Sequence, residues 1–477
     1  MPKIVSSFEL TLRKRPQQVK LTRWLYEELR RAILDRRLPP GTRLPATRDF
    51  AQQYAISRGT VVTAFQQLQT EGFLVGQIGA GTWVNEQLPQ HLLGPKTTEA
   101  PAKKLTGPLP EWVLSFPPRP FRSFVPAISE FPVDIWARVA GHRLRRASAS
   151  LLTGSDARGY GPLREAIAGY LGSKRGVRCS PDQVIIVTGA QQGVDLLARF
   201  LVKPGDAVWV EDPGYFGAKA AFRNAGAKII PVPLDEEGLS ISKGKDLCER
   251  PRAAYLTPAH QFPLGMTMSL QRRLALLDWA REVGAFLIED DYDSEFRFEG
   301  LPVPALQGLD QTGNVILLGS FNKVMFPSLR LGYLVLPASL IDRFLGFRYI
   351  GDLHPSGLDQ AILCDFIVEG HLGRHIRRMC DLYGGRLLAL QENAKKYLEG
   401  IIEIKPIQAG LATSAFLLNG MSSRQAEDAA IAQGIEAMAL DRFVLGSTPV
   451  HGLHLGFAAF DEREIRRGII ALARAIS

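Results

Sequence analysis

The sequence predicts an N-terminal winged helix-turn-helix followed by a large α/β domain, and three observations predict this. At 477 residues the chain is too long for one ordinary domain. Residues 1–85 show three helical patterns and then a short hairpin, whereas residues 116–477 alternate apolar, strand-like runs with helical stretches. Between them, residues 86–115 are rich in proline, which predicts an extended linker.

Three short helices and a wing are predicted within residues 1–85. The first helix carries apolar residues at helical spacing, namely Leu21, Trp24, Leu25, Leu29 and Ile33. The second is expected to begin near Thr47, which can cap it, and the third is expected to follow a second capping residue, Ser57. Residues 72–75 and 81–84 are expected to form the two strands of the wing.

The strands of the large domain are predicted from apolar runs with helical patterns between most of them. These runs are residues 183–187, 207–210, 228–232, 253–256, 285–288, 315–318 and 332–336. Such alternation is typical of an α/β domain with a largely parallel sheet.

Composition narrows the class of protein. Hydrophobic residues make up 46% and charged residues 22%, which is normal for a globular protein. No apolar run of about 18 residues occurs, so no membrane span is predicted. The N-terminus lacks a secretory pattern, and the four cysteines show no metal-ligand spacing. Together these features predict a cytoplasmic protein with reduced thiols and no metal site.

Positive charge is concentrated at the N-terminal end. Residues 1–85 hold 13 Lys and Arg but 6 Asp and Glu, a local net charge of +7 out of +9 for the chain. This asymmetry favours nucleic-acid binding, although charge alone leaves a solvated basic tail open. The third helix of a winged helix-turn-helix enters the major groove with its first residues nearest the bases. The predicted DNA contacts are therefore Ser57, Arg58, Gly59 and Thr60, with Arg48 placed for phosphate.

Several segments of this module resemble the GntR family of regulators. They are residues 44–48 (LPATR), 56–61 (ISRGTV), 68–74 (LQTEGFL) and 79–84 (GAGTWV). The resemblance implies that Arg48, Arg58 and the wing-tip Gly79 contact double-stranded DNA. A winged helix that docks on a protein is the alternative, and the local charge argues against it.

Lys323 is the most informative residue of the large domain, because it closely follows the apolar run 315–318. Burying an ammonium without a partner is costly, so a lysine placed there tends to have a lowered pKa and usable amine chemistry. Ser320 and Arg330 flank it and can both reach a phosphate. This combination predicts a lysine that forms a Schiff base with pyridoxal 5'-phosphate (PLP).

Further residues fit a PLP site. Asp290 closes an apolar strand and is the candidate for the pyridine nitrogen, with Tyr292 available to the ring's phenolic oxygen. A surface acidic loop is the alternative for Asp290. Residues 184–193 (VIIVTGAQQG) predict a strand turning into a helix whose first amides can hold phosphate. Tyr215 can stack on the pyridine face, although an aromatic residue in such a place more often packs in the core.

Residues 120–477 together resemble the fold-type I aminotransferase domain, and with the head they resemble the MocR/GabR-type branch of the GntR regulators. The resemblance also rests on residues 131–138 (FPVDIWAR), 159–168 (GYGPLREAIA), 257–265 (TPAHQFPLG) and 375–379 (HIRRM). It implies a homodimer. The PLP site that it implies consists of Lys323, Asp290, Tyr292, Tyr215, Ala190, Gln191, Ser320 and Arg330.

The chain departs from the aminotransferase pattern at several positions, among them Gly154, residues 260–263 and Asn322, and one further departure bears directly on the substrate. In a segment similar to residues 453–458 (LHLGFA), working aminotransferases carry an arginine that grips the substrate's α-carboxylate. This chain has His454 there, a weaker cation whose charge depends on pH.

The prediction is therefore a PLP-dependent transcriptional regulator that reads an operator with repeated or inverted half-sites. Its effector is PLP, or an amine forming an external aldimine on PLP. Two alternatives stay open: a working aminotransferase carrying a DNA-binding head, and a regulator that no longer binds PLP.

Overall fold

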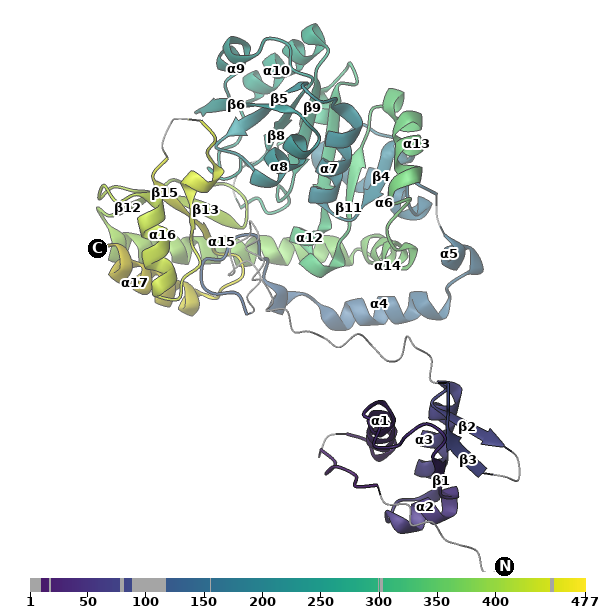
Figure 1. The fold of residues 1–477 in the computed structure, drawn as a ribbon. Coiled ribbons are helices and arrows are strands. Elements are labelled where there is room, and N and C mark those ends of the chain that lie inside the picture. The colour runs from purple at the N-terminus through teal and green to yellow at the C-terminus, as the bar shows by residue number, and fades with distance from the viewer. Residues whose placement is uncertain are drawn as a thin grey trace, which may run out of the picture. The chain divides into compact units, whose positions relative to one another are not determined.

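The computed structural model describes residues 10–16, 19–77, 81–87, 117–154, 156–298, 300, 303–446 and 450–477. The chain divides into two compact units, residues 1–109 and 110–477, which we call the head and the effector domain and describe separately (Figure 1). Most of the expected linker lies outside the described residues, so the boundaries 1–85, 86–115 and 116–477 remain predictions.

The described part of the head is a three-helix unit with a small antiparallel sheet. It contains α1 (Leu21–Leu34), α2 (Thr47–Gln53), α3 (Arg58–Thr70), β1 (Arg43–Leu44), β2 (Leu74–Gln77) and β3 (Gly81–Val84), with the strands in the order β1-β3-β2. Leu25, Phe50 and Phe65 lie in its buried core.

Of the two helix caps predicted in the head, the structure confirms the one at Ser57 and not the one at Thr47. The Ser57 hydroxyl accepts a hydrogen bond from the Thr60 amide (3.2 Å) and caps α3, as expected. Thr47 does not cap α2, because it is already the first helical residue and the preceding residue, Ala46, has no side-chain acceptor. β1 was not predicted, since two residues give no periodicity.

The effector domain is built on an eight-stranded sheet in the order β4-β11-β10-β9-β8-β5-β6-β7 (Figure 1). These strands are β4 (Val184–Val187), β5 (Ala207–Asp212), β6 (Lys228–Asp235), β7 (Gly238–Leu239), β8 (Ala253–Leu256), β9 (Phe286–Asp291), β10 (Val315–Ser320) and β11 (Gly332–Val335). The pairings from β10 through β9, β8 and β5 to β6 are parallel, whereas β11 runs antiparallel to both its neighbours. The expected α/β class with a largely parallel sheet is therefore confirmed.

Both faces of this sheet are buried, which explains why its strands are continuously apolar. In β4, Ile185 and Val187 belong to one buried core, whereas Val184 and Ile186 belong to another. The helices preceding or packing on the sheet are α4 (Val133–Arg145), α5 (Ala149–Thr153), α6 (Gly161–Arg175), α7 (Ala190–Leu201), α8 (Phe216–Asn224), α9 (Ile241–Leu247), α10 (Leu270–Val283), α11 (Leu306–Leu309), α12 (Phe321–Val324), α13 (Ile341–Gly351), α14 (Gly357–Val368) and α15 (His371–Leu398).

The C-terminal part forms a second, antiparallel sheet in the order β12-β13-β15-β14. Its elements are β12 (Ile402–Ile404), β13 (Ala412–Leu417), α16 (Ser423–Ala432), β14 (Met438–Ala439), β15 (Gly452–Gly456) and α17 (Glu462–Ile476). Among the helices of the described residues, none is long and apolar enough to cross a membrane.

Candidate functional site

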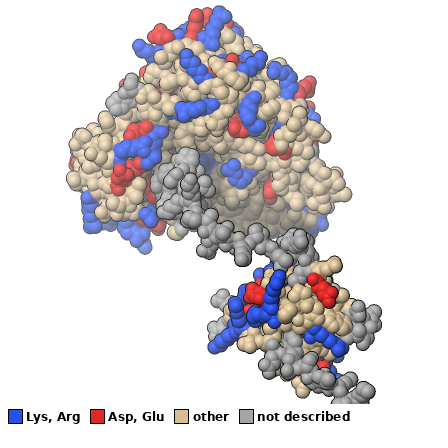
Figure 2. Space-filling view, viewed as in Figure 1, with Lys and Arg blue, Asp and Glu red and all other residues tan. Residues whose placement is uncertain are grey.

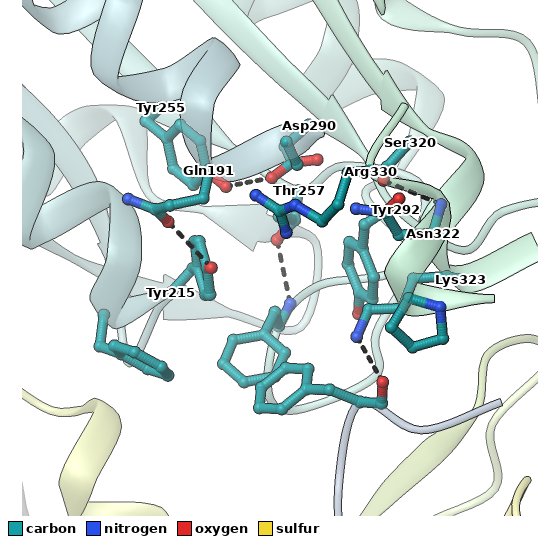
Figure 3. Close-up of a pocket in the computed structure, with 15 residues that line it drawn as sticks. Gln191, Tyr215, Tyr255, Thr257, Asp290, Tyr292, Ser320, Asn322, Lys323 and Arg330 are labelled. Carbon is teal, nitrogen blue, oxygen red and sulfur yellow. Dashed lines mark hydrogen bonds between the residues drawn. The ribbon is translucent and has the colours of Figure 1, made fainter. Parts of the chain in front are cut away.

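The eight residues predicted for PLP line one cavity with a volume of about 260 Å³ (Figure 3). They reach it from the carboxyl ends of β4, β5, β9 and β10 and from the turns that follow. This is the edge of a parallel sheet at which ligands of α/β proteins bind. The remaining lining residues are Phe124, Phe216, Tyr255, Thr257, Phe262, Asn322 and Pro327.

Lys323 lies in α12, directly after β10, with its side chain in the cavity wall (Figure 3). Its Nζ donates a hydrogen bond to the Phe124 carbonyl (2.6 Å) and lies 4.7 Å from the centre of the Phe124 ring. Burial lowers the pKa of Lys323 to about 7, against the opposing charges of Asp293 and Asp290. Near neutral pH a large fraction of this amine is therefore uncharged and nucleophilic.

Asp290 is 4% exposed at the end of β9, which excludes the surface-loop alternative. The Tyr255 hydroxyl donates to one carboxyl oxygen, while the other, Oδ1, is buried without a partner. Burial raises the pKa of Asp290 to about 7, and the Tyr255 hydrogen bond opposes this rise. A buried carboxyl oxygen that lacks a donor fits a protonated ring nitrogen in the cavity.

The opposite end of the cavity suits an anion. Ala190 and Gln191 are the first residues of α7, whose N-terminal amides point to this end, and Ser320 is the last residue of β10. The Arg330 guanidinium is exposed and makes no hydrogen bond or ion pair with any described residue. A helix N-terminus beside an uncommitted guanidinium is an arrangement that binds phosphate.

Besides Tyr255, the tyrosines Tyr215 and Tyr292 line this cavity (Figure 3). The Tyr215 hydroxyl donates to Gln191 Oε1 (3.0 Å), and its ring packs edge-on against Phe262. This position leaves both ring stacking and core packing open for Tyr215. The Tyr292 hydroxyl lies 3.0 Å from His260 Nδ1, which is itself 3.0 Å from Asp293 Oδ1, a chain that the sequence did not predict.

A second, smaller cavity adjoins Lys323 and is lined by His260, Asp293 and His454 among others. His454 is 4% exposed in β15, and its Nδ1 lies 2.7 Å from the Ser123 hydroxyl. Burial, together with the nearby His260 and Lys323, lowers the pKa of His454 to about 3, so the ring is neutral. Of the described residues that line the two cavities, the arginines and lysines are Lys323 and Arg330 alone.

The predicted DNA-reading residues cluster at the start of α3. Ser57, Arg58 and Gly59 are exposed there, and the Ser57 and Thr60 hydroxyls lie 2.8 Å apart, so both already take part in the helix cap. Arg48 on α2 and Arg58 are exposed and make no hydrogen bond or ion pair with described residues. Gly79 lies outside the described residues. Figure 2 shows basic side chains gathered on the visible face of the head, with few acidic ones among them.

Comparisons with known proteins identify both units. Residues 21–84 match the gntR family of bacterial regulatory proteins, and residues 128–350 match the aminotransferase class I and II family. The probable rhizopine catabolism regulatory protein MocR of Rhizobium meliloti is 38% identical over 474 residues, which cover 97% of this chain and 94% of that protein. The chain belongs to the MocR group of GntR-family transcriptional regulators. The pyridoxine biosynthesis transcriptional regulator PdxR of Corynebacterium glutamicum is 33% identical over 455 residues, with 95% of each chain covered.

Solved structures confirm the fold of this regulator's effector domain. Kynurenine aminotransferase of Pyrococcus horikoshii, in complex with PMP, matches 75% of this chain and 90% of its own, with a TM-score of 0.70 and 28% identity. The α-aminoadipate aminotransferase LysN of Thermus thermophilus matches 75% of this chain and 91% of its own, with a TM-score of 0.69 and 29% identity. The effector domain therefore has the fold-type I aminotransferase fold, whose members generally bind PLP.

Several residues that line the cavities of the regulator or contact their lining escaped the sequence analysis. Tyr255 lay within a correctly expected strand, but nothing in the sequence showed that its hydroxyl meets Asp290, 35 residues away. Phe124 and Ser123 follow the proline-rich segment and carry no motif, yet they meet Lys323 and His454. Only the tertiary structure reveals these contacts, because the paired residues are 199 and 331 positions apart in the sequence. In the described part of the chain, no group of three or more His, Cys, Asp or Glu could hold a metal ion.

Proposed function

We propose that this regulator binds PLP at Lys323 and that PLP, or an amine joined to it, is the signal that changes its affinity for DNA. Bound PLP supplies an aldehyde that condenses with the lysine amine with loss of water, and a ring that withdraws electrons. The chain's own groups suit that ligand. Lys323 offers an amine with a pKa of about 7, and Asp290 offers a buried oxygen without a donor.

The phosphate is proposed to lie at the other end of the same cavity. Arg330 and the Ser320 hydroxyl flank this end, and the first amides of α7, from Ala190 and Gln191, close it. A phosphate dianion there would satisfy a guanidinium that lacks any partner among the described residues. The proposed roles of Tyr215 and Tyr292 are contacts to the ring face and to its phenolic oxygen.

The observation that carries the receptor role is the state of His454. A buried imidazole with a pKa of about 3 and a hydrogen bond to Ser123 carries no positive charge. An α-amino acid entering beside Lys323 would bury its carboxylate without a cation, at a high cost in free energy. Binding without efficient turnover suits a sensor, which needs only different affinities in two conformations.

An active aminotransferase carrying a DNA-binding head is the second candidate. Its support is the identity of 28–29% with solved aminotransferases over about three quarters of the chain. Steady-state transamination, assayed with PLP across amino acids and simple amines, separates the two candidates. Rapid conversion over many turnovers would favour the enzyme, whereas slow conversion or none favours the receptor.

On DNA, the regulator is proposed to act in the cytoplasm as a homodimer that reads two half-sites. Support for the dimer comes from exposed apolar side chains on the effector domain. Val133 and Leu144 on α4, Leu152 on α5 and Ile350 on α13 are 61%, 52%, 64% and 87% exposed. Single exposed apolar residues are common. Three of these four lie on α4 and α5, which both pack on α14, and exposed apolar side chains that gather in one region are typical of an interface. Sedimentation velocity on the full chain tests the assembly.

The proposal as a whole is tested on the purified full chain with DNA from upstream of its own coding sequence. PLP should produce the visible absorbance of a lysine-bound cofactor and should alter DNA affinity. Lys323→Ala should abolish both effects. If Lys323→Ala left the absorbance or the PLP-dependent change in DNA affinity in place, Lys323 would not be the site.

A further inference from the structure

We propose that residues 119–124, which we call the strap, carry the state of Lys323 to the linker and so to the DNA-binding head. This inference rests on the proposed function, because it takes PLP bound at Lys323 as the signal. The strap begins two residues after the first described residue of the effector domain, residue 117, and it contributes the Phe124 wall of both cavities. It is therefore the one described segment that meets the cavity and leads directly into the linker.

The contact between Lys323 and Phe124 is sensitive to what happens at the amine. Lys323 Nζ donates to the Phe124 carbonyl and lies over the Phe124 ring. An ammonium has three hydrogens to donate and a full charge for the ring. Once Nζ is bonded to the carbon of a ligand, it keeps at most one hydrogen, and the ligand fixes where that hydrogen points. The bond to Phe124 and a bond to a ligand therefore compete for the same atom.

The other end of the strap is fastened to the C-terminal sheet. Arg122 forms a buried ion pair with Glu436, with Nη2 2.7 Å from Oε1, and the Arg119 amide donates to the same carboxylate (3.0 Å). Phe121 bridges to Gly456, whose amide donates to the Phe121 carbonyl (2.9 Å). These contacts join the strap to the C-terminal sheet, so a shift of Phe124 must be accommodated by the strap together with its contacts to Glu436 and Gly456.

The strap also connects Lys323 with His454. Ser123 lies between Phe124 and Arg122 in sequence, and its hydroxyl is 2.7 Å from His454 Nδ1. The Phe124 ring itself lies 6.2 Å from the His454 ring, measured between centroids. The second cavity is lined by Phe124 and His454, so a ligand that extends past Lys323 towards it would contact Phe124 and the imidazole that is hydrogen-bonded to Ser123. Binding of PLP alone and binding of PLP joined to an amine should therefore both change the contacts of the strap.

The backbone of the strap is poised for such a change. Phe121 and Phe124 have φ values of 67° and 68°, a left-handed conformation that is unfavourable for residues with a side chain. Such conformations persist only where surrounding contacts enforce them, and they cluster at ligand clamps and switches. Loss of the hydrogen bond from Lys323 removes one of the contacts that hold Phe124 in this left-handed conformation.

The test uses the full chain with its operator DNA and two variants, Phe124→Ala and Ser123→Ala, with Ile128→Ala as the matched control. Ile128 is 45% exposed, lies four residues after the end of the strap and lines neither cavity. Three quantities are measured: visible absorbance at saturating PLP, the ratio of operator affinities with and without PLP, and amide hydrogen exchange of residues 119–124 with and without PLP.

In the wild type and in Ile128→Ala, we expect PLP to change exchange in the strap and to change operator affinity by about 5- to 150-fold, the usual range of coupling between sites. Ser123→Ala, whose side chain lines neither cavity, should still show cofactor absorbance, while the affinity ratio of both strap variants falls to within about twofold of one. The proposed role of the strap is refuted if both variants keep the wild-type ratio of operator affinities. It is also refuted if PLP does not change amide hydrogen exchange of the strap in the wild type. If the wild type shows no cofactor absorbance with PLP, or if PLP does not change its operator affinity, the proposed function itself is refuted.

Discussion

The rate at which Lys323 captures PLP is expected to rise with pH and to level off just above neutrality. Burial lowers the pKa of Lys323 from 10.5 to about 7, so the neutral, reactive amine predominates above that pH. With a pKa of about 7, roughly one tenth of the amine is neutral at pH 6, about half at pH 7 and about nine tenths at pH 8. An ordinary lysine, with a pKa of about 10.4, is less than about 1% neutral even at pH 8.

The magnitude follows from these fractions. Between about pH 6 and pH 8 the capture rate should rise about tenfold and then stay flat, whereas an ordinary lysine would gain about a hundredfold and continue upward. Stopped-flow absorbance with PLP measures the rate, and the same titration with N-acetyl-lysine corrects for the ionisation of PLP itself. Asp293 supports the charged form of Lys323, so Asp293→Asn should move the midpoint to lower pH. A rate that keeps rising in parallel with N-acetyl-lysine would refute the reasoning.

Three further predictions concern other parts of the two sites. Arg330→Ala should weaken PLP binding by about 1.5–3 kcal/mol, as measured by calorimetry, and should leave the binding of pyridoxal, which lacks the phosphate, nearly unchanged. Equal losses of affinity for PLP and pyridoxal would show that Arg330 does not bind the phosphate. Arg58→Ala should cost about 1–3 kcal/mol in operator affinity and relax sequence preference across an operator panel, and unchanged binding would show that α3 is not the reading helix. His454→Arg should create a spectral response to α-amino acids through a new carboxylate contact, and no response at any concentration would contradict the role given to His454.

The fold could be predicted where one rule of physical chemistry dominates. Strands such as β4 and β10 are buried on both faces, so they appear in the sequence as unbroken apolar runs. The direction of β11 could not be predicted, because an apolar run does not record whether its neighbours run parallel. The C-terminal sheet was missed for another reason. Its strands are two to six residues long, and β13 carries Thr and Ser among its buried residues.

In the candidate site, too, some residues could be predicted from the sequence and others could not. Lys323, Asp290 and Ala190 could be found because each stands at the carboxyl end of a recognisable strand or at the start of the following helix. The partners that set their properties could not be found this way. Tyr255 and Phe124 act through contacts that only the folded chain brings together. The neutral state of His454 likewise follows from its burial in β15, which residue type alone does not reveal.

The most direct test of the central claim is an operator-binding titration on the full-length regulator, with and without PLP, for the wild type and Lys323→Ala. A regulator that senses PLP at Lys323 should show operator affinities that differ by at least about fivefold with and without PLP. Lys323→Ala should bind the operator with one affinity under both conditions. Equal operator affinity of the wild type in the presence and absence of PLP, at concentrations where cofactor absorbance is saturated, would contradict the claim.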